Sequence, residues 1–115
     1  MSTIDPRVHD YLEHIQHAIE RIQRYTKTMD EVAFLQHEMA QDAVIRNIEI
    51  IGEASNNITR RDPNFAAQHD EIPWAVIYAM RNRVSHAYHK VDLEIVWNMI
   101  QNDLPQLHRQ IVNLS

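Results

Sequence analysis

The chain holds a single glycine, Gly52, and four prolines among its 115 residues. Tight turns between short strands draw on glycine and on residues that accept unusual backbone angles, whereas long helices need almost none of them. This scarcity of turn residues favours an all-α fold. A chain of 115 residues can bury one core and is too short for two, so we expect a single helical domain over residues 1–115.

Apolar residues recur at helical spacing in four long stretches of the sequence. The stretches cover residues 6–25, 40–59, 72–84 and 93–114. Shorter helices are predicted at residues 31–35 and 65–68. The pattern therefore predicts an up-and-down bundle of four main helices with one or two short helices.

Caps and prolines mark where these helices begin. Asp5 and Asp92 precede the first and last stretches, and aspartate is a typical N-cap. Pro6 and Pro73 are expected in the first helical turn, where the missing N–H of proline costs nothing. Pro105 falls inside the last stretch, so we expect it to kink or restart that helix.

The composition excludes several classes of protein. The chain has no cysteine, which rules out disulfides, thiolate metal sites and cysteine nucleophiles. The N-terminus lacks the pattern of a signal peptide, and no apolar run approaches the ~18 residues of a spanning helix. We therefore expect a cytoplasmic protein with no membrane segment. The formal charge of −5 disfavours broad binding of nucleic acid, so any such site must be local.

Residues 80–90 concentrate cations in this acidic chain. The run holds Arg81, Arg83, Lys90 and His86, and it contains no acidic residue. Cleavage of RNA without a metal needs a base for the 2′-hydroxyl, an acid for the leaving oxygen and a cation over the phosphate. Histidine can transfer the protons near neutral pH, and the planar fork of arginine grips a phosphate. One site in this run could hold both.

Helical geometry limits how these side chains can meet. At about 100° per residue, Asn82 and His86 share a face, whereas Arg81 and His86 lie about 140° apart. Arg81 and His86 meet at one phosphate only if the helix ends or bends near Ser85, or if a second protomer completes the cleft. The alternative is a solvated helix end, at which the cations complement the negative end of the helix dipole. The residue types and their spacing leave both interpretations open.

The spacing from Arg81 through His86 to Tyr88 resembles the signature of the HepT group of HEPN toxins. Further segments match that group in the same order along nearly the whole chain. They are residues 50–54, 73–74, 80–83, 91–97 and 103–105. Ser85 and Ala87 stand where the group commonly has an aliphatic residue and a glycine, a difference that leaves the catalytic pair intact and could alter the local turn.

This resemblance implies a helical homodimer that cleaves RNA, with tRNA as the expected substrate and with no metal or other cofactor. Arg81 and His86 carry over as the catalytic pair, with Asn82 in support. The resemblance further implies a minimal nucleotidyltransferase antitoxin, which adds AMP to Tyr88 and so silences a toxin that otherwise stops growth. The added phosphate would compete with RNA for the cations of the site.

Other polar residues could support the same site. Glu53 follows Gly52 in an apolar helical stretch, where glycine permits the close approach of another helix. Glu53 could be buried and orient a cation of the run 80–90, or it could face solvent at the edge of the stripe. Asn82 could orient His86 or bind phosphate, with helix capping as its alternative. Arg83 and Lys90 are candidates for contacts with RNA.

Two other functions compete with the ribonuclease. A non-catalytic helical adapter, which presents nucleotide or substrate to a nucleotidyltransferase, predicts binding without cleavage. A metal-binding bundle could use His9, His14 and His17. Alternatively, Glu49 and Glu53 could act as the inward carboxylates of a di-iron bundle. The sequence has no matched pair of inward Glu-x-x-His motifs, so we expect solvated histidines and no metal.

Overall fold

The computed structural model describes residues 4–85 and 92–114, and every regular element in these ranges is helical. The elements are α1 (Pro6–Thr26), α2 (Glu31–Leu35), α3 (Glu38–Arg61), α4 (Pro63–Gln68), α5 (Trp74–Ser85), α6 (Leu93–Asn98), the π-helical turn η1 (Met99–Asp103) and α7 (Leu104–Leu114). The predicted all-α fold class is confirmed. No helix in the described ranges is long and apolar enough to cross a membrane.

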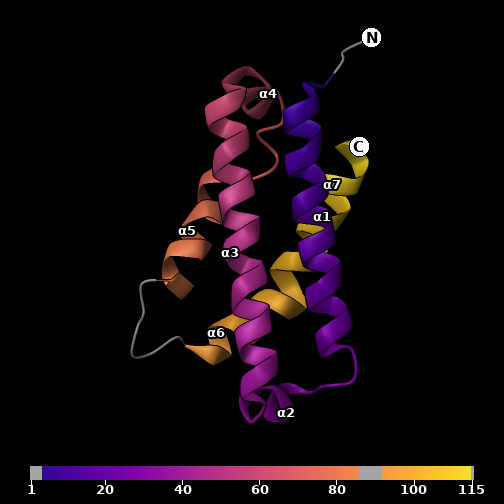
Figure 1. The fold of residues 1–115 in the computed structure, drawn as a ribbon, viewed down its shortest axis with the longest axis vertical. Helices are drawn as coiled ribbons and strands as arrows, with labels where there is room; N and C mark the ends of the chain where they lie inside the picture. The colour runs from indigo at the N-terminus through magenta and orange to yellow at the C-terminus, as the bar shows by residue number, and fades with distance from the viewer. Residues whose placement is uncertain (1–3, 86–91, 115) are drawn as a thin grey trace.

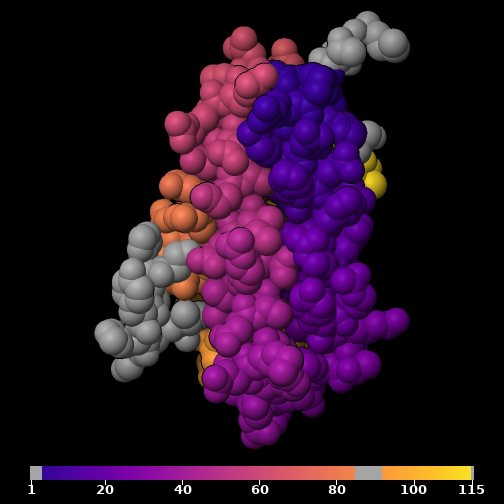
Figure 2. Space-filling view, in the orientation of Figure 1, coloured from indigo at the N-terminus to yellow at the C-terminus, as the bar shows by residue number. Residues whose placement is uncertain are grey.

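The helix α3 lies at the centre of the arrangement. Helices α1 and α3 run antiparallel and side by side along the long axis, with α2 at the turn that joins them (Figure 1). Helix α5 packs on the other flank of α3, and α7 packs against α1. Figure 2 shows α1 and α3 together forming one broad face of the molecule. A site on the face of α5 that is turned to α3 is therefore built against α3.

The core is formed by the apolar stripes that the sequence predicts. Its largest fully buried side chains include Leu12, Ile15, Ile19 and Ile22 of α1, Ile48, Ile51 and Ile58 of α3, Phe34 of α2, and Leu104 and Ile111 of α7. Burial of each such side chain contributes roughly 1.5–3 kcal/mol. Because α3 buries residues toward both α1 and α5, it holds these two helices at fixed positions.

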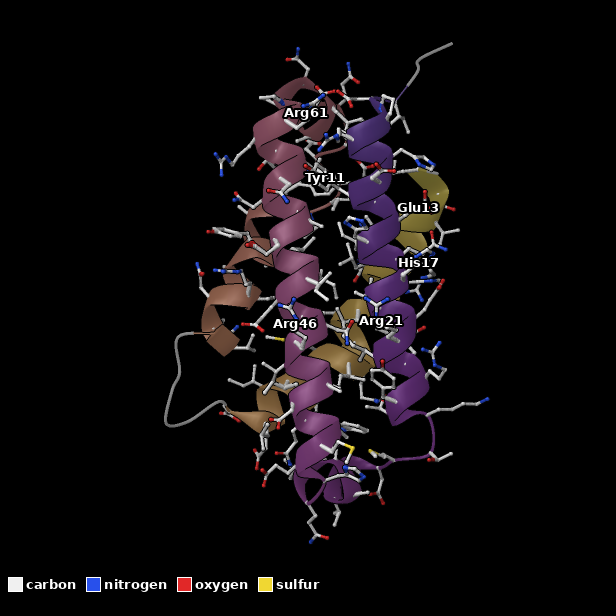
Figure 3. All side chains as sticks on the ribbon, in the orientation of Figure 1. Tyr11, Glu13, His17, Arg21, Arg46 and Arg61 are labelled. Atoms are coloured by element: carbon white, nitrogen blue, oxygen red, sulfur yellow. The ribbon has the colours of Figure 1, made fainter. Side chains whose placement is uncertain are left out.

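Two polar contacts tie α1 to α3. Nε of Arg21 donates to Oδ1 of the buried Asn47 at 2.8 Å. At the end of α3, Nε of Arg61 donates to Oδ2 of Asp5 at 3.2 Å. Figure 3 shows Arg61 at one end of the α1–α3 pair and Arg21 a little beyond its middle. These contacts fix the register of the two helices beside their apolar core.

Aspartate side chains begin several of the helices. They are Asp5 at α1, Asp30 at α2, Asp62 at α4 and Asp92 at α6, and each accepts a hydrogen bond from a backbone N–H of the first turn. The caps predicted at Asp5 and Asp92 are confirmed. Pro73 is predicted in the first turn of the helix, but α5 begins at Trp74. The carbonyl of Pro73 accepts the N–H of Ile77 at 3.0 Å, so Pro73 is the N-cap of α5. Neither position requires an N–H from proline.

The last three elements, α6, η1 and α7 (residues 93–114), form a C-terminal arm, and this arm contains a π-helical turn just before Pro105. In η1 the N–H of Leu104 bonds to the carbonyl of Met99, five residues back. Pro105 has no N–H, and its ring would clash with the carbonyl of Gln101 in a regular α-helix. The wider turn avoids that clash, and α7 starts at Leu104. The restart predicted at Pro105 is confirmed.

Candidate active site

Arg81 lies on the side of α5 that faces α3. Its Nη2 is 3.8 Å from Oε1 of Glu53 on α3. Its Nη1 donates to Oδ1 of Asn82 at 3.4 Å, which is a long hydrogen bond. The guanidinium also lies 6.0 Å from the centre of the Tyr78 ring, one turn earlier on α5. The cation is thus surrounded by a carboxylate, an amide and an aromatic face.

Gly52 allows α5 to approach α3 this closely. The residue is buried in α3 beneath the stem of Arg81. A Cβ added at position 52 would overlap the Cβ of Arg81 and would lie 3.2 Å from its Cγ. The interpretation of Gly52 as a point of close helix approach agrees with this contact, and the approaching helix is α5.

The hydrogen-bonding capacity of Arg81 is only partly used. The Glu53 side chain is 54% exposed, so solvent screens its attraction for the guanidinium. Nε of Arg81 is buried and has no hydrogen-bond acceptor among the residues that the structure describes. A guanidinium carries several N–H donors in one plane, an arrangement that suits the oxygens of a phosphate. Arg81 can therefore bind an anion at its outer edge.

The structure brings together some of the predicted site residues and separates another. Arg81, Asn82 and Glu53 form one cluster. Arg83 is exposed and lines a groove between α5 and the C-terminal arm, because two residues along a helix turn a side chain by about 200°. Three predicted site residues, His86, Tyr88 and Lys90, lie outside the described residues.

Tyr78 is a member of this cluster that the sequence patterns did not single out. It precedes Arg81 by three residues, and residues three or four apart are neighbours on a helix. That spacing was the signal that could have identified it. A cation over an aromatic face contributes roughly 0.5–1 kcal/mol at an exposed site. Tyr78 therefore steadies Arg81 from α5, while Glu53 contacts it from α3.

The groove beside Arg83 has an apolar floor and a charged rim. Its volume is about 260 Å³. The apolar lining consists of Pro73, Val76, Ile77 and Met80 on one side and Met99, Leu104 and Leu107 on the other. Glu71, Arg83 and Asp103 provide charges at its rim. Val76 is 60% exposed, so the apolar surface continues outward onto α5.

One group of side chains on α1 has the composition of a metal site. The ligand atoms of His9, Asp10 and Glu13 lie within 4.8 Å of one another, and Nδ1 of His9 is 3.0 Å from Oε1 of Glu13. Figure 3 shows Glu13 on the side of α1 that is turned away from α3. The group lies at the surface, and exposed acidic groups of this kind are common without a metal. It is separate from the Arg81 cluster.

Comparisons with known proteins give consistent matches. A family model described as ribonuclease HepT-like matches residues 15–114. A "Probable ribonuclease HepT" from Thermococcus cleftensis is 46% identical over 99 residues, which cover 85% of this chain and 86% of that protein. A "Putative RNase" from Caldanaerobacter subterraneus is 33% identical over 101 residues, which cover 88% of each chain.

A longer relative contains the same region as part of its chain. A "Gamma-glutamylcyclotransferase and putative RNase" from Methanocaldococcus jannaschii is 39% identical over 104 residues. The match covers 90% of this chain and 46% of that protein. No solved structure gives a significant match.

Proposed function

The chain belongs to the family of HepT-like ribonucleases, and from that premise we propose that it is a metal-independent endoribonuclease that cleaves tRNA. The enzyme is the toxin of a toxin–antitoxin pair. The observation that carries the proposal is the Arg81 cluster, in which a guanidinium is held against α3 and its two Nη groups keep N–H donors for a phosphate. The sequence places His86 five residues further along the chain.

The proposed reaction is a transfer of the phosphate from one ribose oxygen to another. The 2′-hydroxyl loses its proton and attacks the phosphorus, and the bond to the 5′-oxygen of the next nucleotide breaks. His86 serves as the base or as the acid that protonates the leaving oxygen. Arg81 stabilises the charge that develops on the phosphate, and Asn82 supports these groups. The products carry a 2′,3′-cyclic phosphate and a 5′-hydroxyl.

Lys90 extends the binding surface, and we place it against a phosphate that flanks the cleaved bond. Arg83, which is exposed on α5, is assigned to the contact between two copies of the chain described below. Glu53 keeps the guanidinium of Arg81 in its orientation. The formal charge of −5 opposes RNA at long range, so these local contacts must outweigh it. Binding should therefore weaken steeply as salt increases.

Regulation of the proposed enzyme lies at Tyr88, two residues after His86 in the sequence. A nucleotidyltransferase antitoxin adds AMP to this hydroxyl. The added phosphate is an anion, and it would compete with RNA for Arg81. The partner therefore silences the site by covering its cations.

A homodimer completes the proposal, and its interface is the outer face of α5 with the adjoining groove. The exposed Val76 and the apolar floor of the groove favour association, because burial removes them from water. Glu71 precedes α5 and Arg83 lies near its end. Two copies of α5 packed antiparallel would bring these opposite charges together across the interface.

The first test is cleavage of tRNA in EDTA by wild type, Arg81→Ala and His86→Ala, with analysis of the product ends. We expect the wild type to leave 2′,3′-cyclic phosphates and both variants to lose activity while they keep their helical circular dichroism. Arg24→Ala, which removes an exposed cation from α1, serves as the matched control and should cleave normally. Cleavage that requires an added metal would contradict metal independence.

The same proteins distinguish the adapter from the ribonuclease. Each is expressed in cells with and without a nucleotidyltransferase antitoxin. A wild type that is soluble, harmless and inactive on RNA, yet binds the nucleotidyltransferase, would overturn the ribonuclease and favour the adapter. Growth arrest that depends on His86 and is relieved by the partner only when Tyr88 is present would support the proposal.

A further inference from the structure

We infer that Gly52 is a positioning residue for Arg81. Because glycine has no side chain, the aliphatic stem of Arg81 can pack directly on the backbone of α3 at this point. An added Cβ at position 52 would meet the Cβ, Cγ and Cδ of Arg81 in sequence, with 3.2 Å to Cγ and 3.4 Å to Cδ. The stem therefore lies along α3 instead of standing away from it. This inference rests on the proposed role of Arg81 in binding the phosphate.

This packing of the stem on α3 determines the position of the guanidinium. Along the stem, Nε is already buried, whereas Nη2 reaches the half-exposed Glu53, the residue that follows Gly52. The Arg81 side chain as a whole is 27% exposed, so a phosphate can reach the guanidinium only where α3 does not cover it. A free arginine has many rotamers, and a stem fixed in advance loses less freedom when a phosphate binds.

The position of the glycine supports a specific role. Glycine is unfavourable inside a helix, yet the chain's single glycine stands in the interior of the 24-residue α3. The three heavy atoms nearest to the added Cβ all belong to Arg81. An alanine at position 52 would suit an isolated helix better, but here it would force α5 outward and move the guanidinium with it.

Two sets of measurements test this inference. The first is a stability cycle of Gly52→Ala, Arg81→Gly and the double variant. The clash involves the Cβ of residue 81, so Gly52→Ala should lower Tm in the Arg81 background and raise it once position 81 is glycine. If Gly52→Ala alone does not fold, the double variant should fold. A rise in Tm in both backgrounds would overturn the inference.

The second measurement is NMR of the arginine Nε–H groups, with the Arg81 signal assigned by its loss in Arg81→Lys. The buried Nε–H should exchange slowly with water in the wild type and faster in Gly52→Ala. Ala54→Gly, which weakens α3 two residues further on, should leave the signal unchanged. Unchanged exchange in Gly52→Ala would contradict the inference, whether or not the protein cleaves RNA.

Cleavage assays then connect the position of Arg81 to the reaction. A misplacement of about 1 Å can cost about 100-fold in rate, so we expect a loss of that order in kcat for Gly52→Ala. Ala54→Gly should remain active at temperatures below its Tm. A wild type that is inactive would refute the proposed function, whereas an active wild type with a fully active Gly52→Ala would refute only the positioning role.

Discussion

Glu53 contacts the candidate catalytic arginine through a long and solvent-screened ion pair. Its carboxylate is 3.8 Å from Nη2 of Arg81, and its side chain is 54% exposed. Such a pair contributes less than about 1 kcal/mol, which corresponds to no more than about fivefold in rate. We therefore predict that Glu53→Gln lowers kcat/KM for RNA by up to about fivefold and barely changes the free energy of unfolding.

The control for this prediction is Glu13→Gln, since Glu13 is also half-exposed and paired, with His9 on α1. It should cleave RNA as the wild type does. A much larger loss for Glu53→Gln would mean that the carboxylate contacts the reacting groups. A gain in activity would mean that Glu53 competes with the phosphate for Arg81, contrary to the supporting role proposed for it.

At the level of single residues, spacing predicts neighbours within a helix better than neighbours between helices. The 100° step of a helix is enough to place Tyr78 beside Arg81 and Arg83 on another face. It cannot say which helix covers Arg81, because that depends on the packing of segments far apart in the sequence. Gly52 indicates a close approach, and the packing of α5 on α3 identifies the side chain that approaches.

Among the secondary-structure elements, α6 depends strongly on its N-cap. The helix has six residues, and Asp92 accepts hydrogen bonds from the N–H groups of Glu94 at 3.0 Å and Ile95 at 3.3 Å. Loss of such a cap costs about 1 kcal/mol. We predict that Asp92→Ala lowers the free energy of unfolding by about this amount in urea titrations, while Asp92→Asn stays near the wild type. Equal losses in both variants would show that capping is not the cause.

The helices were predictable from the sequence, and their ends and irregularities less so. The predicted start of the second main helix at residue 40 is two residues late, because His37 caps α3 by accepting the N–H of Ala40 on its Nδ1. Histidine is outside the usual set of N-caps. Pro105 predicts a restart, but the π turn lies upstream, where the carbonyl of Gln101 would meet the proline ring.

For the molecule as a whole, one polar contact fastens the C-terminal arm to α1. Nε2 of His108 lies 2.9 Å from Oε2 of Glu20, and Gln16 donates to the same carboxylate at 3.1 Å. The hydrogen bonds from His108 and Gln16 hold the pKa of Glu20 below its ordinary value of 4.5. The stability that this depressed pKa contributes is present at pH values above the pKa of Glu20 in the unfolded chain. It is lost as the pH falls through the pKa of Glu20 in the folded protein.

We therefore predict that Glu20→Gln flattens the acid dependence of stability. The Tm of the wild type should fall as the pH drops below about 4.5, and the difference between wild type and variant should shrink over the same interval. The effect should be small, since the Glu20 side chain is 40% exposed. Calorimetry at a series of pH values, with Glu13→Gln as control, measures it. A difference in Tm that is independent of pH would contradict the linkage.

The proposed interface on α5 can be tested with a matched pair of valines. Val76 on α5 is 60% exposed and Val32 on α2 is 63% exposed. Val76→Asp should convert the dimer to a helical monomer in sedimentation experiments, while Val32→Asp should leave it dimeric. A Val76→Asp protein that stays dimeric would exclude this face as the interface.

Charge reversal tests the antiparallel arrangement of that interface. If Glu71 of one copy meets Arg83 of the other, Glu71→Arg should weaken the dimer by bringing like charges together. Adding Arg83→Glu to the same chain restores opposite charges at both ends of the two-fold interface, so the double variant should recover the dimer. Recovery of the dimer would show that residues 71 and 83 pair across the interface, because two independent substitutions would each weaken the dimer and their effects would add. A double variant weaker than either single one would refute the antiparallel packing of α5 even if Val76 lies in the interface.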